Sequence, residues 1–259
     1  MAETIAVLSL KGGTGKTTTV RTLADVLRRV GLDVLAIDLD PQGNLSDYFD
    51  VPPDASPTIA DVLSGEAKAK AADHGGIVPA TPILAEVERS LSGKMGRELV
   101  LRKALKDARK QHDVVLIDCP PALGLLTING LVAADWALIS SEAQYFALQG
   151  VQGALDVIEQ AKEFYNPDLK WLGVVMNIAD MRTVHSREAY EQLSEHFGEK
   201  VFKTVIRSSI AYAESAEKGL SILDHRPDLG ADYLALADEV LARIGMRDAR
   251  RALKPLLAS

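Results

Sequence analysis

Eight residues near the start of the chain, Lys-Gly-Gly-Thr-Gly-Lys-Thr-Thr at 11–18, constrain its fold more than any other segment. The apolar run at 4–10 comes directly before them and predicts a buried strand. Apolar residues at helical spacing follow over 16–30, and Gly31 is expected to end this helix. A glycine-rich turn that joins a buried strand to a helix indicates an α/β fold.

The rest of the chain repeats this alternation. Further strands are expected at 32–38, 77–79, 114–118, 136–141, 171–177 and 201–206. Helices are expected at 58–64, 84–91, 95–110, 123–133, 147–164, 185–196, 210–217 and 230–245, followed by a short basic helix at 248–257. This alternation predicts a doubly wound, mostly parallel sheet with helices on both faces. Because no repeat or linker interrupts it, residues 1–259 are expected to form one domain with a basic tail over about 247–259.

The composition of the chain indicates in which cell compartment the protein is located. Hydrophobic residues make up 47% of the 259 residues and charged residues 25%, which is typical of a globular protein. No apolar run approaches the roughly 20 residues that cross a bilayer, and the first strand begins too early for a signal peptide. The single cysteine, Cys119, cannot form an internal disulfide or a cysteine-rich metal site. We therefore expect a cytoplasmic protein.

Charge is distributed unevenly along the chain. The formal net charge is −7, which argues against a protein that is basic throughout and coats nucleic acid. Residues 241–259, however, hold five Arg and Lys residues against Asp248, a local charge of +4. The sequence is therefore also compatible with a local basic surface on an otherwise acidic protein.

The glycine-rich segment carries the residue types that phosphate binding needs. Glycines let backbone N–H groups turn inward around phosphates, and the helix N-terminus adds partial positive charge. Lys16 is expected to reach the β- and γ-phosphates, and the Thr17 hydroxyl is expected to bind Mg²⁺. The match to Gly-x-x-x-x-Gly-Lys-[Ser/Thr] is relaxed, because the first glycine position falls on Leu10. The predicted residues for Mg·ATP are Gly12, Gly13, Thr14, Gly15, Lys16, Thr17 and Thr18.

Three aspartates follow predicted strands. Asp38 and Asp40 end the second strand two residues apart, and therefore on one side of it. A carboxylate near the γ-phosphate can orient the attacking water, although a solvated strand end explains this spacing equally well. Asp118 ends the apolar run at 114–118, a Walker B pattern that holds Mg²⁺. We interpret the neighbouring Cys119 as a packing residue, because no histidine stands beside it in sequence.

The first lysine of the segment gives the pattern Lys-Gly-Gly-x-Gly-Lys-[Thr/Ser]-[Thr/Ser], and here the chain resembles the deviant Walker A group of P-loop ATPases. Asp-Pro-Gln-Gly-Asn at 40–44 and the stretch 113–151 resemble the ParA partition ATPases in particular. So do Val-Pro-Ala-Thr at 78–81 and Phe-Gly-Glu-Lys-Val at 197–201. The resemblance covers nearly the whole chain.

This resemblance implies both a reaction and an association. Lys11 would reach the nucleotide of the partner in an ATP-dependent homodimer, Asp40 would activate the water, and Asp38 would lie close to the magnesium shell. The implied catalytic residues are Lys11, Lys16 and Asp40, and the implied metal-binding residues are Thr17, Asp38 and Asp118. ParA proteins bind nonspecific duplex DNA on the nucleoid, and a ParB-like partner stimulates their slow ATP hydrolysis. The resemblance thus implies an ATPase that positions a plasmid, a chromosome or a protein cargo.

Some family features differ in this chain. Many ParA proteins carry Pro-Arg-Asn against the nucleotide base, where this chain has Arg-Ser-Ser at 207–209. Arg207 and Asn177 are candidates for contact with the base, since an amide matches adenine's donors and acceptors. An asparagine that only turns the end of a strand is an equally good interpretation of Asn177. Family arginines that contact DNA are replaced by Ser-Glu-His at 194–196, which leaves as candidate DNA contacts Lys200, Lys203, Lys218, Arg247, Arg250 and Arg251. Each of these alone is better explained as a solvated charge.

Two other functions stay open. A MinD-like ATPase would use residues 250–257 as an amphipathic membrane anchor, but Pro255 should interrupt that helix and its apolar face is short. Membrane contact is therefore not expected. A metabolic or metal-cluster enzyme of this fold would need a second substrate pocket or several cluster cysteines. One cysteine per chain argues against the cluster.

Overall fold

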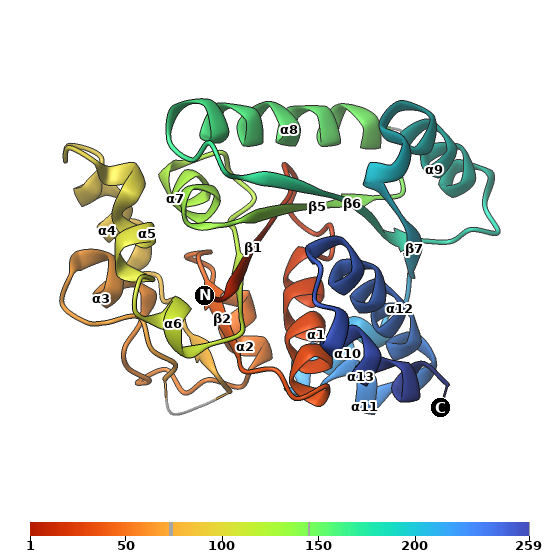
Figure 1. Cartoon of the computed structure of the whole chain (residues 1–259), viewed down its shortest axis with the longest axis horizontal. Helices are drawn as coiled ribbons and strands as arrows, with labels where there is room; N and C mark the ends of the chain where they lie inside the picture. Colours follow the sequence, from red (N-terminus) through yellow and green to blue (C-terminus); the bar gives the residue numbers. More distant parts are fainter. Residues whose placement is uncertain (73–74, 145, 259) are drawn as a thin grey trace.

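The computed structural model describes residues 1–72, 75–144 and 146–258 and has one seven-stranded sheet at its centre (Figure 1). The order of its strands is β3-β2-β4-β1-β5-β6-β7, and all neighbouring pairs are parallel. The predicted α/β fold is confirmed. Tyr145 of the ParA-like stretch and Ser259 of the basic tail lie outside the described residues. The strands are β1 (Glu3–Leu8), β2 (Val34–Asp38), β3 (Ile77–Val78), β4 (Val114–Asp118), β5 (Trp136–Glu142), β6 (Lys170–Ala179) and β7 (Val201–Arg207).

Helices cover both faces of this sheet. Figure 1 shows α7, α8 and α9 above the sheet, and α1, α12 and α13 below it. Ile5 and Val7 of β1 belong to the apolar cluster between the sheet and α1 and α12. Ala6 and Leu8 belong to the cluster on the other face of the sheet, with α7 and α8. Burial on both faces explains why the strands read as continuous apolar runs. The helices are α1 (Lys16–Arg29), α2 (Asn44–Tyr48), α3 (Ile59–Ser64), α4 (Leu84–Leu91), α5 (Val100–Ala104), α6 (Ala108–Gln111), α7 (Leu125–Ala133), α8 (Ala147–Phe164), α9 (Val184–Phe197), α10 (Ala211–Glu217), α11 (Ile222–His225), α12 (Pro227–Ile244) and α13 (Arg247–Ala258).

The single helix predicted at 95–110 is wrong. The structure has three short pieces there: the 3-10 helix η1 (Arg97–Leu99), α5 and α6, with a turn at 105–107. Asn129 of α7 explains the first break, because its side chain accepts a hydrogen bond from Leu101 N (3.1 Å) and donates one to Arg97 O (2.9 Å). Two backbone groups at this junction thus bond to a side chain of α7 instead of to each other along one continuous helix. The helices α2 and α11 were not predicted, because they are too short to show a helical period.

The strands bring the predicted motifs to one edge of the sheet. β1 leads into the glycine-rich loop and α1. β2 and β4 are neighbours, and Asp38 lies in register with Asp118. Because parallel strands end at the same edge, the loop and both aspartates meet there, where ligands of such folds bind.

Candidate nucleotide-binding site

Side chains from neighbouring elements hold the glycine-rich loop between β1 and α1 in place. Ser140 of β5 donates a hydrogen bond to Thr14 O (2.7 Å), and Thr19 of α1 donates one to Gly15 O (2.9 Å). Gly13 and Gly15 have φ angles of 77° and 78°, which residues with side chains rarely adopt. The chain itself therefore fixes the shape of this loop.

Asn177, near the end of β6, completes this support. Its Nδ2 donates to Ser140 Oγ (2.6 Å) and Thr19 Oγ1 (3.3 Å). Both hydroxyls already donate to backbone carbonyls, so they can only accept from Asn177, which fixes the orientation of the amide. Asn177 Oδ1 is left buried without a hydrogen-bond partner among the described residues. An unpaired acceptor is suited to the amino group of adenine, so the predicted contact with the base stays a prediction with a geometric basis.

A cavity of about 770 Å³ lies beside the loop. Its volume falls in the range of small-molecule and cofactor sites. All seven predicted residues from Gly12 to Thr18 line it. Asp40, Asn177 and Arg207 also line it, and α2 and α10 contribute Asp47 and Tyr212. The structure thus brings together the predicted phosphate-binding, water-activating and base-contacting residues.

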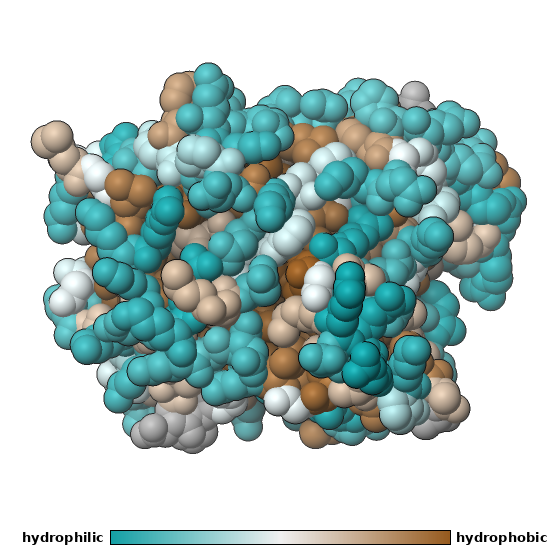
Figure 2. Space-filling model, in the orientation of Figure 1, coloured by the Kyte–Doolittle hydropathy of each residue, from teal (hydrophilic) through white to brown (hydrophobic). Residues whose placement is uncertain are grey.

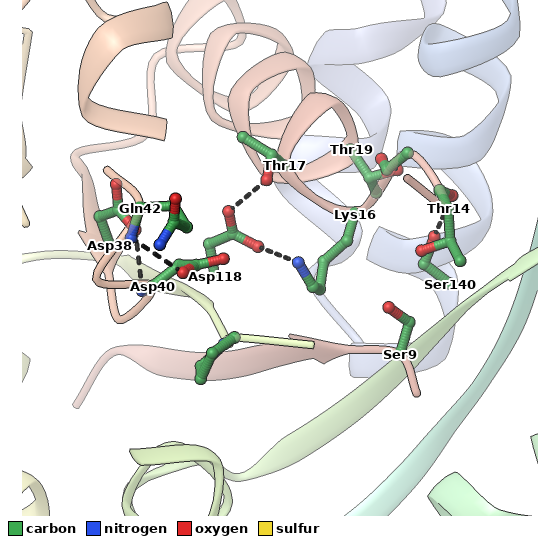
Figure 3. Close-up of polar contacts among 12 residues, drawn as sticks. Ser9, Thr14, Lys16, Thr17, Thr19, Asp38, Asp40, Gln42, Asp118 and Ser140 are labelled. Carbon is green, nitrogen blue, oxygen red and sulfur yellow. Dashed lines mark hydrogen bonds and ion pairs between the residues drawn. The ribbon is translucent and has the colours of Figure 1, made fainter. Parts of the chain in front are cut away.

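Asp118, at the end of the Walker B strand β4, contacts two residues that follow the phosphate loop (Figure 3). Thr17 Oγ1 donates a hydrogen bond to Asp118 Oδ2 (2.7 Å), and Lys16 Nζ lies 3.5 Å from Asp118 Oδ1. Burial lowers the pKa of Lys16, but Asp118, Cys119 and Asp40 together raise it by more, so the lysine stays charged. Asp118 Oδ1 accepts no hydrogen bond from the described residues. The Asp118 carboxylate and the Thr17 hydroxyl offer oxygen ligands of the kind that a magnesium ion prefers.

Asp38 lies beside Asp118, but the chain itself occupies both of its oxygens. Oδ2 accepts hydrogen bonds from Ser46 N (2.9 Å) and Ser46 Oγ (2.8 Å), and Oδ1 accepts one from Asp40 N (3.0 Å). Burial and the neighbouring Asp118 raise the pKa of Asp38 to about 7, against the lowering effect of these hydrogen bonds. The contacts favour a role in shaping the loop at 39–46 over a direct bond to magnesium. The place of Asp38 in the magnesium shell stays a prediction.

Asp40 and Lys11 are placed differently with respect to the cavity. Asp40 is only 7% exposed, lines the cavity and accepts a hydrogen bond from Gln42 N (3.0 Å). Lys11 is exposed and is not among the described residues that line the cavity. Its side chain therefore stands outside the site that Lys16 serves.

Some residues of the site carry no sequence signal. Ser140 and Ser46 belong to no motif, and Ser140 meets its carbonyl partner 126 positions away. Cys119 is fully buried, and burial raises its pKa to about 12. Its Sγ lies against Gly130 of α7, where an added Cβ would approach to 2.8 Å. The interpretation of Cys119 as a packing residue rather than a nucleophile is therefore confirmed.

Comparisons with known proteins agree with this geometry. A family model described as an AAA domain matches residues 2–171. The chromosome-partitioning ATPase Soj of Thermus thermophilus is 40% identical over 245 residues, which cover 93% of this chain and 96% of that protein. The sporulation initiation inhibitor protein Soj of Bacillus subtilis is 36% identical and covers 93% of this chain and 99% of its own length. The chain belongs to the ParA/Soj family of partition ATPases.

A solved structure supports the nucleotide chemistry of this ParA/Soj-family ATPase. Cobyrinic acid a,c-diamide synthase from Mycobacterium smegmatis, with bound ADP and magnesium, aligns with a TM-score of 0.76 at 35% identity. The alignment covers 84% of this chain and 92% of that one. The chain is therefore an ATPase of the ParA/Soj family.

The six candidate DNA contacts of this ParA/Soj-family protein divide into free and paired cations. Lys203, Lys218 and Arg247 are exposed, and no side-chain partner for them is found within residues 1–72, 75–144 and 146–258. The others are held by the chain: Lys200 Nζ donates to Trp171 O (2.7 Å), Arg250 pairs with Asp238 (2.7 Å), and Arg251 lies 3.4 Å from Asp248. Arg207, the candidate for base contact, is likewise paired with Asp232 (2.9 Å). All these assignments stay predictions.

The basic tail of this ParA/Soj-family protein packs onto α12 as α13. Ala249 and Leu253 are buried in the core cluster that α12 shares, with 8% and 0% exposure. Pro255 was predicted to interrupt this helix. That prediction is wrong, because Pro255 lies inside α13. A proline near a helix end removes only one hydrogen bond, which the packing of Leu253 can offset. Among the helices of the described part of the chain, none is long and apolar enough to cross a membrane.

Proposed function

We propose that this chain is an ATP-switched positioning ATPase that binds nonspecific duplex DNA as an ATP-bound homodimer. Slow hydrolysis, stimulated by a ParB-like partner, would then release it from DNA. Cycling of this kind would keep the protein in the cytoplasm on the nucleoid and would move a chromosome, a plasmid or a protein cargo. The Soj/ParA relatives make chromosome partition the first candidate.

The position of Lys11 carries the proposal. Lys16 already provides a buried cation next to Asp118 and the cavity. Lys11 stands at the start of the same loop but is exposed and outside the cavity wall. An exposed lysine beside a phosphate site can neutralise phosphate charge only on a molecule that approaches from outside. A second copy of this chain, carrying its own ATP, supplies that charge.

The residues of one protomer divide the work of hydrolysis. Thr17 and Asp118 would hold magnesium, which supplies positive charge to the β- and γ-phosphates. Lys16 would bind the same phosphates once they replace Asp118 as its counter-charge. Asp40, at the cavity wall, would orient the attacking water and accept its proton. Asp38 would hold the backbone of Asp40 in place through its hydrogen bond.

Dimerisation would also explain how an acidic protein binds DNA. A chain with a net charge of −7 and a few exposed cations should bind phosphates weakly on its own. Two copies on one surface double the number of cations that meet the duplex. DNA binding would therefore depend on ATP.

The test is the ATP-dependent association of Lys11→Ala, measured by analytical ultracentrifugation with a nonhydrolysable ATP analogue. We expect the variant to bind the nucleotide but to stay monomeric, because Lys11 would act only on the partner's nucleotide. Lys94→Ala, which removes an equally exposed lysine away from the loop, should dimerise normally. A normal dimer of Lys11→Ala would contradict the proposal.

The two alternatives find less support. A MinD-like membrane anchor would need the apolar face of α13, which α12 already covers. A metabolic enzyme would need room for a second substrate. A second cavity, next to Lys11 and α8, measures only about 30 Å³.

A further inference from the structure

The strongest local excess of positive charge lies far from the basic tail. Residues 94–110 contain seven Lys and Arg residues against Glu98 and Asp107, a local charge of +5. This segment forms η1, α5 and α6. In Figure 1 α5 and α6 lie at the left of the molecule, whereas α9, β7 and α12 lie at the right. The charge is therefore remote from the candidate DNA contacts on β7 and the tail.

The broken helix turns its lysines outward. Leu101, Leu105 and Ala108 are buried, with 0%, 0% and 2% exposure, and they fix the inner face. Lys103, Lys106 and Lys110 are exposed on the other side. Lys103 lies in α5, Lys106 in the turn at 105–107 and Lys110 in α6, so each piece of this segment presents one of the three lysines to solvent.

Few carboxylates compensate this charge. Asp107 is the only acidic residue between 101 and 112. Lys110 Nζ lies 3.2 Å and Lys68 Nζ 3.9 Å from its carboxylate, and all three side chains are more than half exposed. We call Lys68, Lys103, Lys106 and Lys110 the basic patch. Of its four lysines, Lys68 and Lys110 lie within 4 Å of the Asp107 carboxylate.

The residue types of the basic patch indicate what it binds. Lysine is depleted at protein–protein interfaces, whose energy comes from aromatic, Arg and apolar anchors, and the outer face of α5 and α6 presents lysines instead. Insertion into a lipid surface would require exposed apolar side chains beside the cations, and no large apolar side chain is exposed within residues 101–112. Figure 2 shows a mostly hydrophilic surface over this region. Exposed lysines are suited to the phosphates of a nucleic acid backbone, which need charge but no base recognition.

We infer that the basic patch is a second contact surface for the phosphate backbone of duplex DNA, separate from the contacts of β7 and the tail. The inference rests on the proposed function, because it assumes that the ATP-bound protein reaches DNA. With two separate basic surfaces, one protein could contact two DNA segments, or two stretches of one bent duplex. The retention of the protein on the nucleoid would then exceed what one surface provides.

The test is Lys103→Gln, Lys106→Gln and Lys110→Gln combined in one full-length variant. Glutamine keeps the helix propensity and removes the charge. Binding to a duplex of random sequence is measured with ATP between about 50 and 200 mM salt, where log K falls with log salt in proportion to the phosphates contacted. We expect about tenfold weaker binding near 150 mM, and a salt slope shallower by about 2.7 for each protomer that contacts DNA. ATP hydrolysis without DNA and the melting temperature should not change.

The matched control carries Lys103→Arg, Lys106→Arg and Lys110→Arg, which keep the charge and should bind like the wild type. Unchanged affinity and slope in the glutamine variant, with DNA binding intact in the wild type, would overturn this inference alone. No DNA binding by the wild type with ATP would overturn the proposed function and this inference together. If phosphatidylserine vesicles bind the wild type but not the glutamine variant, while DNA binding is unchanged, the surface belongs to a membrane and the inference is wrong.

Discussion

Lys16 Nζ lies 3.5 Å from Asp118 Oδ1, and both side chains are nearly inaccessible, with 8% and 1% exposure. The cation for the phosphates and the carboxylate for magnesium therefore neutralise each other inside the protein. Mg·ATP can replace this pair without leaving a buried charge unpaired, because magnesium goes to Asp118 and the phosphates go to Lys16.

Replacing Lys16 by alanine should abolish ATP binding and destabilise the protein. The buried Asp118 would lose its counter-charge, which typically costs about 3 kcal/mol. Binding of a fluorescent ATP analogue and urea unfolding measure the two effects. Lys11→Ala serves as the control for a lost lysine in the same loop and should retain binding. Affinity within a few-fold of the wild type would contradict the assignment of Lys16.

Replacing Asp40 by alanine should preserve ATP binding but stop hydrolysis, and should therefore trap the ATP-bound dimer. Asp40 lines the cavity and would orient the water, whereas Lys16 and Lys11 remain to hold the phosphates. Single-turnover hydrolysis with light scattering tests both effects. Asp47→Ala, which removes another carboxylate from the wall of the same cavity, should hydrolyse ATP normally. An active Asp40→Ala variant, or one that stays monomeric with ATP, would show that Asp40 has another role.

Asp38 should make the stability of the protein depend on pH. Its pKa is raised from 3.8 to about 7 in the folded state, so the folded protein keeps a proton that the unfolded chain releases. The contribution of Asp38 to the free energy of unfolding therefore falls as pH rises from about 4 to about 7, and it is constant above that. One pKa unit corresponds to about 1.4 kcal/mol, so the effect should be measurable.

Asp38→Asn should flatten this dependence, because asparagine does not titrate. Urea unfolding at several pH values between 4 and 8, without nucleotide or magnesium, measures the slope. The variant loses an acceptor for Asp40 N and should be less stable at low pH, so the comparison concerns slopes only. The exposed Asp47→Asn should run parallel to the wild type. An Asp38→Asn slope equal to that of the wild type would refute the shifted pKa.

Ser140→Ala should make the phosphate loop more mobile, because it removes the hydroxyl that holds Thr14 O. The change removes the hydroxyl donor of Thr14 O and leaves Asn177 Nδ2 with only the longer hydrogen bond to Thr19 Oγ1 (3.3 Å). An unpaired buried group costs about 1–3 kcal/mol. We expect lower stability and a raised KM for ATP, with kcat less affected. Ser141→Ala, the neighbouring change on the same strand, should have little effect on KM. Equal KM values for the two variants would exclude a role of Ser140 in shaping the loop.

Arg247 and Arg251 provide the sharper test of the tail, because Arg250 is paired closely with Asp238 (2.7 Å), whereas Arg251 has only the longer, more exposed contact with Asp248 (3.4 Å). Arg247→Gln combined with Arg251→Gln should weaken DNA binding to every sequence alike. The salt slope should become shallower by about 1.8 for each protomer that contacts DNA. Mobility shifts with ATP at two salt concentrations measure this, and Arg247→Lys with Arg251→Lys should restore binding. Unchanged binding would leave Lys203 and Lys218 as the candidates.

Much of the fold and of the phosphate site could be predicted because it is encoded locally. The loop needs glycines at positive φ between a strand and a helix, and Lys16 and Thr17 follow directly along the chain. The strands read as apolar runs because both faces of the sheet are buried, and parallel topology then brings Asp40 and Asp118 to one edge. Residue type and spacing are sufficient for such features.

The tertiary structure alone decided the features that depend on pairs far apart in sequence. Asn129 breaks the helix predicted at 95–110 from another element, and Ser140 supports a loop that is 126 positions away. Ser46 donates two hydrogen bonds to Asp38, which the family resemblance placed near the metal. Arg247 and Arg250 are both arginines of one tail, but within the described part of the chain only Arg250 has an acidic side chain, Asp238, within reach. A side chain's role is determined by what it contacts, and a single sequence does not specify contacts between distant segments.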